Sequence, residues 1–190
     1  MQRTVSVVNQ TNAAYPVPPS GRILVPPVSL NSISNFTSLT VSAYAVPVFV
    51  KKRSIFSGVA FGINGTCTDF SAKIAVYKDL GGVPGSKVDG TDATGGPYTE
   101  AASASKNIAF SQNVTLDAGW YWLVFQGSAN QSVMAIGSTG STVLVGAADM
   151  IQGHGRITIT NTYTNGLPSS FGTPTYTVAS GPVYLGLVVA

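Results

Sequence analysis

Glycine and proline interrupt every stretch of this chain that could otherwise form a helix. The sequence has 21 Gly and 11 Pro among its 190 residues, and no segment longer than about ten residues keeps a helical apolar period. Short apolar or alternating runs recur instead, at residues 4–8, 22–25, 39–43, 46–50, 55–63, 72–78, 106–110, 114–116, 120–125, 133–136, 142–145, 157–163, 176–178 and 183–189. Short strands separated by turn formers predict an all-β fold, an antiparallel β-sandwich of jelly-roll-like type.

Residues 117–125 hold both tryptophans and predict the central core strand. A turn ending at Gly119 leads into two alternating apolar sets, Trp120, Trp122 and Val124 on one face and Tyr121, Leu123 and Phe125 on the other. A strand that is apolar on both faces is expected to be covered by the opposing sheet on one side and by a loop or subunit on the other. We therefore expect Trp122 and Leu123 in the core, and Trp120 also, although nearer the open end of the strand. Any recognition surface is then expected in the turn-rich loops.

The first 35 residues differ from the rest. Prolines at positions 16, 18, 19, 26 and 27 favour extended backbone that cannot join the middle of a sheet. Such a segment either wraps the domain or reaches a neighbouring subunit, and the apolar residues between 23 and 30 favour burial over a disordered linker. The expected organisation is an extended proline-rich N-terminal arm at 1–35 and an antiparallel β-sandwich domain at 36–190.

Charged residues make up only 9% of the chain, against roughly 25% in ordinary soluble domains. A weakly charged, neutral-polar surface suits a protein that is largely covered by copies of itself or by partners. The one basic cluster, Lys51-Lys52-Arg53, is interpreted as a solvated strand edge or loop that discourages edge pairing, with phosphate binding as the weaker alternative. Only Arg3 and Arg22 precede it, which argues against direct contact with nucleic acid.

Candidate chemistry is sparse. Cys67 is the only cysteine, so an intrachain disulfide is excluded, and His154, the only histidine, lies in a glycine-flanked loop and is interpreted as a turn residue rather than a base. Asp89 and Asp92 share a Gly/Thr loop, but the closing Glu of a calcium loop is missing, which favours a solvated turn.

No phosphate-cradling loop or nucleophile elbow occurs, and no carboxylate pair stands out. We therefore expect a protein that is not an enzyme, has no cofactor and no metal, and has ligand-binding residues that the sequence does not identify. Tyr98, Tyr163 and Tyr176 lie near turns and are the better candidates for exposed contacts, although a structural role is the first interpretation of each.

The chain shows neither a secretory signal pattern nor an apolar run near the roughly 20 residues of a membrane span. Synthesis and assembly in a cytoplasm, without membrane insertion, are expected.

Several motifs, in this order, resemble a recurrent β-sandwich module of tailed-bacteriophage virion proteins, notably tail-fibre and other surface components. The matching pieces are the proline-bearing run 44–50, the long strand 55–61, the run 72–78 leading into Gly82-Val83-Pro84-Gly85, the run 114–123 with its Ala-Gly-Trp-Tyr-Trp-Leu motif, Leu167-Pro168, and residues 182–185. The resemblance covers about residues 36–190, and Gly95-Gly96-Pro97 departs from it. The family has no shared catalytic residues to carry over.

The resemblance implies a non-enzymatic virion structural protein, a tail or fibre component that contacts a host surface glycan. The alternative is a capsid decoration or other head-associated protein, because sandwiches of this kind serve several roles. Expected partners are other copies of the chain, with a trimer favoured, and other virion proteins, without direct nucleic acid contact. The expected location is the virion, after assembly in the host cytoplasm.

Overall fold

Two antiparallel sheets packed face to face form the fold. The structure is a computed structural model, and it describes residues 20–21, 23–24, 33–38, 40–136, 156–177, 183 and 185–190. Every strand pairing is antiparallel, and the described residues contain no α-helix, only a short 3-10 turn at Tyr163–Asn165. The sequence-based prediction of an all-β antiparallel sandwich is therefore confirmed.

The first sheet, called sheet I, is built around β4. Its strands follow the order β1-β13-β4-β10-β2, and β8 pairs with the other side of β4. The strands are β1 (Ile23–Leu24), β2 (Ile33–Thr37), β4 (Ser54–Ile63), β8 (Ala104–Leu116), β10 (Ser132–Ile136) and β13 (Leu185–Val189). The separately predicted runs at 106–110 and 114–116 are thus parts of one long strand, β8.

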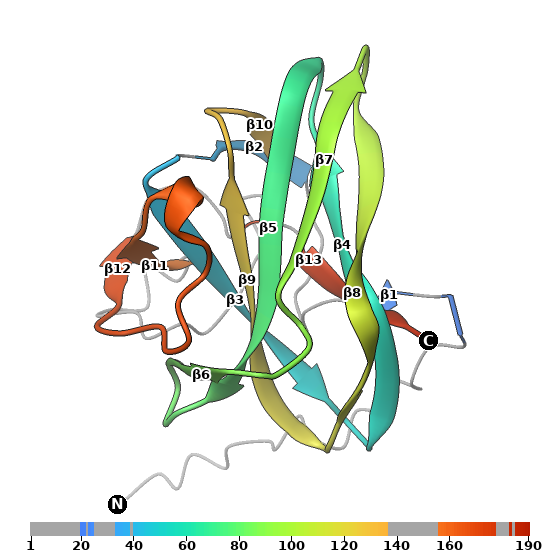
Figure 1. The fold of residues 1–190 in the computed structure, drawn as a ribbon, viewed down its shortest axis with the longest axis vertical. Helices are drawn as coiled ribbons and strands as arrows, with labels where there is room; N and C mark the ends of the chain where they lie inside the picture. The colour runs from blue at the N-terminus through green and yellow to red at the C-terminus, as the bar shows by residue number, and fades with distance from the viewer. Residues whose placement is uncertain are drawn as a thin grey trace, which may run out of the picture.

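The second sheet, sheet II, has the order β12-β11-β3-β9-β5-β6, with β7 also paired to β5. Its strands are β3 (Ser42–Val50), β5 (Cys67–Asp79), β6 (Pro84–Lys87), β7 (Ala93–Glu100), β9 (Gly119–Gly127), β11 (Arg156–Thr160) and β12 (Thr175–Thr177). The predicted central strand, β9, lies between β3 and β5 in this sheet (Figure 1).

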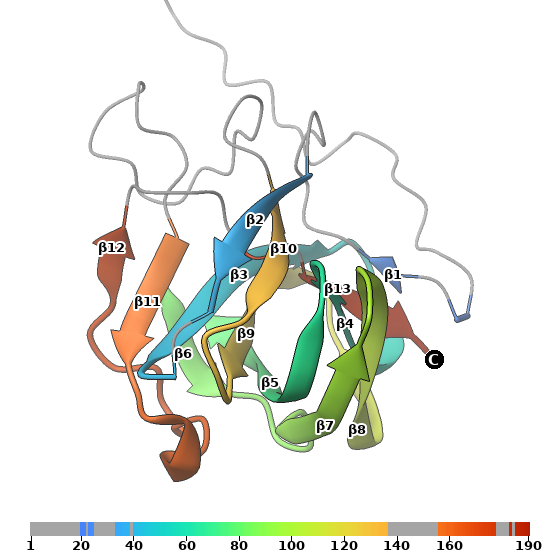
Figure 2. The same cartoon turned by 90° about the horizontal axis from the view of Figure 1, so that it is seen from above.

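The chain passes from one sheet to the other between β7 and β8. β7 pairs with β5 in sheet II, whereas β8 pairs with β4 in sheet I, so residues 101–103 link the sheets at one edge of the sandwich. Figure 2 shows this edge on the side opposite β11 and β12. No strand was predicted at 93–100, where Gly95-Gly96-Pro97 departs from the pattern that the rest of the domain resembles.

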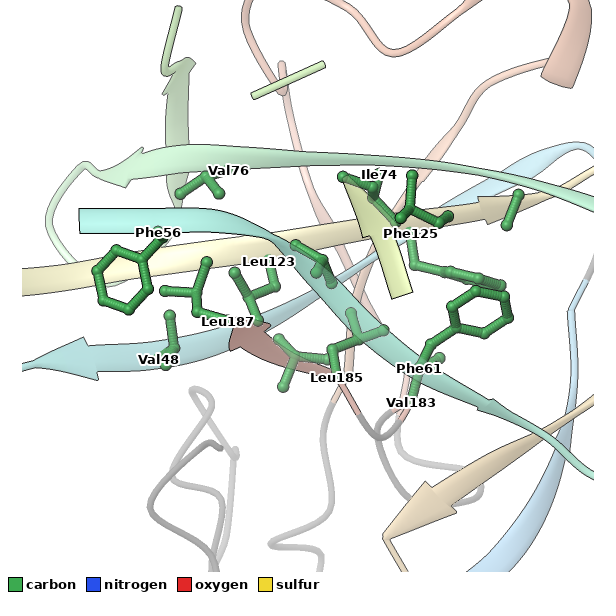
Figure 3. Packing of buried hydrophobic residues seen from close by; sticks show 14 of the residues in the cluster. Val48, Phe56, Phe61, Ile74, Val76, Leu123, Phe125, Val183, Leu185 and Leu187 are labelled. Atoms are coloured by element: carbon green, nitrogen blue, oxygen red, sulfur yellow. The ribbon is translucent and has the colours of Figure 1, made fainter. Parts of the chain in front are cut away.

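The main core fills the space between the two sheets. Alternate residues of each strand point inward, as the period of two requires. Figure 3 shows side chains of Val48, Leu123 and Phe125 from sheet II facing Phe61, Leu185 and Leu187 from sheet I. Phe125 packs against Phe61 as a tilted aromatic pair, with ring centroids 5.3 Å apart. These contacts hold β9 rigidly at the centre of the sandwich.

Two backbone features of the sandwich have clear structural reasons. The pairing of β4 with β8 shifts register between Phe56 and Gly58, and a Cβ at Gly58 would lie 2.3 Å from the carbonyl oxygen of Ile108, so only glycine fits this bulge. β11 pairs with β3 only as far as Ala45, so at Pro47 the described strands flank β3 on one side only. A residue without an N–H is tolerated there.

Two short pieces of the expected N-terminal arm belong to the sandwich. β1 pairs with β13, and β2 pairs with β10 across the expected boundary at residue 35. Both pairings agree with an arm that wraps the domain. Most of residues 1–32, together with the expected strands at 4–8 and 142–145, lies outside the described residues, so the arm itself stays a prediction.

Candidate functional site

Strand β9 has two buried faces at its centre. Leu123 and Phe125 point into the core between the sheets, while Trp122 and Val124 point to the outer face of sheet II. There they join a second cluster, called the outer cluster, made of Ala43, Ala45, Ala75, Tyr77, Trp122, Val124, Ile157, Ile159, Leu167 and Phe171. The prediction that both faces of this strand are covered is confirmed for Trp122 and Leu123.

A segment of the same chain covers the outer face of sheet II. Residues 161–174, called the covering segment, contribute Leu167 and Phe171 to the outer cluster. Phe171 meets Tyr77 edge to face, with ring centroids 5.6 Å apart, and the Tyr77 hydroxyl donates a hydrogen bond to the Pro168 carbonyl. A loop of this chain, rather than a second subunit, therefore closes this side of β9.

Polar groups hold the first part of the covering segment, residues 161–166, on the sheet. Gln126 is fully buried, and its amide nitrogen donates to the carbonyls of Thr40 and Asn161. The Asn161 side-chain amide donates to Gln126 Oε1 at 2.8 Å and to the Gly166 carbonyl at 2.8 Å. Lys73 donates to the Tyr163 carbonyl, and its ammonium lies 4.4 Å from the centre of the Tyr163 ring. These bonds fix the segment on the sheet.

Trp120 lies beyond the reach of this cover. Its side chain is 45% exposed, whereas Trp122, two residues further along the same face, is 3% exposed. The ring of Trp120 rests on that of Phe49, its partner across the β3–β9 pairing, with centroids 5.1 Å apart and planes tilted by 52°. The expectation that Trp120 packs in the core is therefore wrong, because the outer cluster ends at Trp122.

The basic cluster lies at the same end of the sandwich as Trp120. Lys51, Lys52 and Arg53 are exposed in the turn between β3 and β4, immediately after Val50, which pairs with Gly119. Figure 1 shows this turn beside the β8–β9 turn at the bottom of the molecule. Arg53 Nε lies 3.7 Å from Asp117 Oδ1, but both side chains are largely exposed, so this ion pair contributes little to stability.

Asp79 borders the exposed aromatic pair and has a structural role. Its Oδ1 accepts a hydrogen bond from Trp122 Nε1 at 2.8 Å, and its Oδ2 accepts one from the Gly82 amide at 3.2 Å. Next to it, Lys78, Asp79, Leu80, Gly85, Ser86 and Ser170 line a depression of about 360 Å³. The carboxylate thus joins the centre of sheet II to the β5–β6 turn.

The residues considered for catalysis are not brought together. Cys67 is buried in the core between the sheets, and His154 lies outside the described residues. In the loop that was compared with a calcium site, Lys87 forms an ion pair with Asp92, while Thr91 Oγ1 donates to the Val88 carbonyl at 2.7 Å. Within the described part of the chain, no group of three or more His, Cys, Asp or Glu gathers at metal-binding distances.

The tyrosines proposed for exposed contacts are partly buried instead. Tyr98 meets Phe61 edge to face at 6.0 Å, and Tyr163 lies under Lys73. Burial raises the pKa of both hydroxyls above the ordinary value for tyrosine. Both therefore have structural contacts, and the side chain of Tyr176 lies outside the described ones.

The exposed Trp120–Phe49 pair is the feature that sequence reasoning missed. One sequence signal for an exposed side chain was present, since Trp120 directly follows the turn at Gly119. Its exposure, however, depends on how far the covering segment, about 40 residues later in the chain, extends over β9.

Among the described residues, no helix is long and apolar enough to span a bilayer. Comparison with protein-family models, with curated proteins and with solved structures finds nothing that matches this chain.

Proposed function

We propose that this chain is a non-enzymatic structural protein of a phage virion, a tail or fibre component that contacts a glycan on the host surface. The motifs that resemble phage sandwich modules support this proposal. They fall on β3, on β4, on β5 with β6, and on β8 with β9, which are strands of one sandwich in the expected order. The partners in this proposal are other copies of the chain, as a trimer, and other virion proteins.

The exposed pair of Trp120 and Phe49 is the observation that carries the attachment role. An indole that is 45% exposed on a rigid sheet offers a flat apolar surface with a polar edge, which suits contact with a partner that is partly apolar and partly wet. It stands at one end of the sandwich, next to two turns, where a large surface could approach it.

The engagement of the reactive side chains supports the non-enzymatic part of the proposal. Cys67 is 6% exposed within the core, and Asp79 and Asp92 already accept bonds from Trp122 and Lys87. The one cysteine and these two carboxylates are thus engaged in contacts of the fold.

The location of the chain on the virion tests the proposal. Virions of the phage that encodes this chain are labelled with a gold-conjugated antibody against it and imaged in negative stain. Label at the tail or its fibres is expected. Label on the head instead would support the alternative of a decoration protein, and virions without the chain would refute both. Virions lacking the gene, supplied with the other structural proteins, serve as the labelling control.

A further inference from the structure

The aromatic pair at the end of sheet II forms an exposed platform. Phe49 and Trp120 are partners across the β3–β9 pairing, so their rings stand side by side on the outer face. Strand side chains stand roughly perpendicular to the sheet, and the backbone beneath them is fixed by pairing on β3, β9 and β5. The platform is therefore preorganised, and little side-chain freedom is lost when a ring stacks on it.

Unpaired positive charge gathers around this platform. In the described part of the chain, no carboxylate lies at ion-pair distance from Lys51, Lys52 or Lys78. The other described lysines are engaged elsewhere: Lys73 with the Tyr163 carbonyl, Lys87 with Asp92, and Lys106 with Glu100. Lys51 and Lys52, in the turn after β3, are thus available to a ligand at this end of the sandwich.

Lys51 and Lys52 lie close to the aromatic pair, because they directly follow the end of β3. Lys51 directly follows Val50, the last residue of β3, and is two residues from Phe49. Lys78 pairs with Tyr121 across β5 and β9, and Tyr121 packs against the main core, so the register places Lys78 on the opposite face of sheet II from Trp120.

We propose that the Trp120 end, defined as Phe49, Lys51, Lys52 and Trp120, binds an acidic saccharide that carries carboxylate or phosphate groups. The apolar C–H face of a sugar ring stacks on Trp120, and the acidic group of the same or the next unit pairs with Lys51 and Lys52. This inference rests on the proposed attachment function, because it names the ligand class and the site for it.

The observations favour a saccharide over a lipid bilayer. Trp120 belongs to the strand face and rests on Phe49, instead of projecting from the tip of a turn. A ring of this kind can receive a flat ligand, whereas its entry into the apolar part of a membrane would draw the exposed charges of the turn 51–53 out of water. The surplus of lysine explains why an acidic glycan is preferred to a neutral one.

Binding of the purified full-length protein to immobilised bacterial polysaccharides tests the proposal. The panel contains uronate-bearing, phosphate-bearing and neutral polysaccharides, together with phosphatidylglycerol vesicles and inorganic polyphosphate. Retention of one or more acidic polysaccharides is expected, weakening as salt rises. The uronate and phosphate arms show which acidic group is recognised. Polyphosphate is expected to bind at least about tenfold more weakly, because it offers no ring to Trp120.

Matched variants separate the site from general effects. Trp120→Ala is expected to weaken binding of the retained polysaccharide by about 30-fold, and Val41→Ala, at the opposite end of β3, is expected to leave it unchanged. Lys51→Gln with Lys52→Gln is expected to weaken binding by about tenfold at low salt. Lys106→Gln, which removes one positive charge on β8, is the charge control. Unchanged thermal unfolding of Trp120→Ala shows that the fold is intact.

Three results would overturn the inference. They are retention of no acidic polysaccharide, equal retention by the wild type and Trp120→Ala, and binding to phosphatidylglycerol vesicles alone. Each of these results is distinguishable from failure of the proposed function, because the position of the antibody label on the virion tests that function separately. A labelled tail with no saccharide binding removes only the site, and saccharide binding by a chain that is missing from virions removes only the virion role.

Discussion

Trp122 Nε1 donates a hydrogen bond of 2.8 Å to Asp79 Oδ1. The donor belongs to a side chain that is 3% exposed, while the acceptor lies on an exposed carboxylate. The bond therefore satisfies a buried indole N–H at the boundary between the outer cluster and solvent. It also separates the roles of the two tryptophans, because Trp122 is fixed by Asp79 while Trp120 remains open to a ligand.

Asp79→Ala is expected to lower the free energy of unfolding by about 1–3 kcal/mol, because it leaves the indole N–H of Trp122 without its acceptor. Asp79→Asn keeps an oxygen acceptor and is expected to cost less. Urea denaturation measures both. In a double-mutant cycle with Trp122→Phe, the loss from Asp79→Ala should shrink when the donor is gone. Equal losses in both backgrounds would show that the bond does not carry the effect.

Gln126→Ala is expected to destabilise the protein by about 2–4 kcal/mol, because it leaves buried groups of Thr40 and Asn161 without partners. Gln126→Glu keeps the shape but places a carboxylate where an amide donates, so it should also destabilise. Thermal and urea unfolding measure these changes. Gln112, an exposed glutamine on β8, supplies the control, and a Gln126→Ala protein as stable as Gln112→Ala would contradict the assigned role.

Phe171→Ala is expected to loosen the covering segment, with a loss of about 3–5 kcal/mol, since Phe171 is a large buried side chain of the outer cluster. Water would then reach Trp122, and the tryptophan emission of the folded protein should shift to the red. Leu80→Ala, at a side chain that is 68% exposed, is the control. An unchanged emission maximum would mean that the segment does not shield Trp122.

Tyr77 is expected to make stability depend on alkaline pH. Burial, and then the negative charge of Asp92, raise the pKa of its hydroxyl in the folded state. Below about pH 10 the hydroxyl is protonated in both states. Above that, the unfolded chain releases the proton while the folded chain retains it, so stability falls by up to about 1.4 kcal/mol per pH unit.

Urea denaturation between about pH 9 and pH 11.5 measures this slope. Tyr77→Phe removes the ionisable group, so the fall in stability above about pH 10 is expected to become shallower, even though the variant is less stable overall through loss of the bond to Pro168. Tyr98, Tyr121 and Tyr163, whose pKa values are also raised by burial, leave a residual slope. Identical slopes in the wild type and the variant would contradict the assignment.

The sequence predicted the strands whose side chains alternate regularly. Ile74 and Val76 face the main core while Ala75 and Tyr77 face the outer cluster, as their period of two indicated. Strand β7 was missed because Gly95-Gly96-Pro97 lacks the apolar alternation of a strand. In the structure a Cβ at Gly95 would lie 2.2 Å from Tyr98 Oη, so glycine is required there by packing within a strand. Close packing of this kind is not visible in a local pattern.

The candidate site was harder to predict, because it depends on contacts between distant parts of the chain. The turn at Lys51-Lys52-Arg53 was correctly expected to be exposed. The exposure of Trp120 depends instead on how far Leu167 and Phe171 cover β9. Its neighbour Phe49 is brought beside it by strand pairing. Neither relationship follows from the apolar alternation that placed all of residues 120–125 in the core.

Competition with virions for host cells tests the attachment role of the Trp120 end most directly. Host cells are preincubated with the purified wild-type protein, with Trp120→Ala or with Val41→Ala, and the fraction of phage that adsorbs is then measured. The wild-type protein and Val41→Ala are expected to reduce adsorption to the same extent, while Trp120→Ala requires about 30-fold more protein for the same effect. Equal competition by all three proteins, or competition by none, would contradict the account.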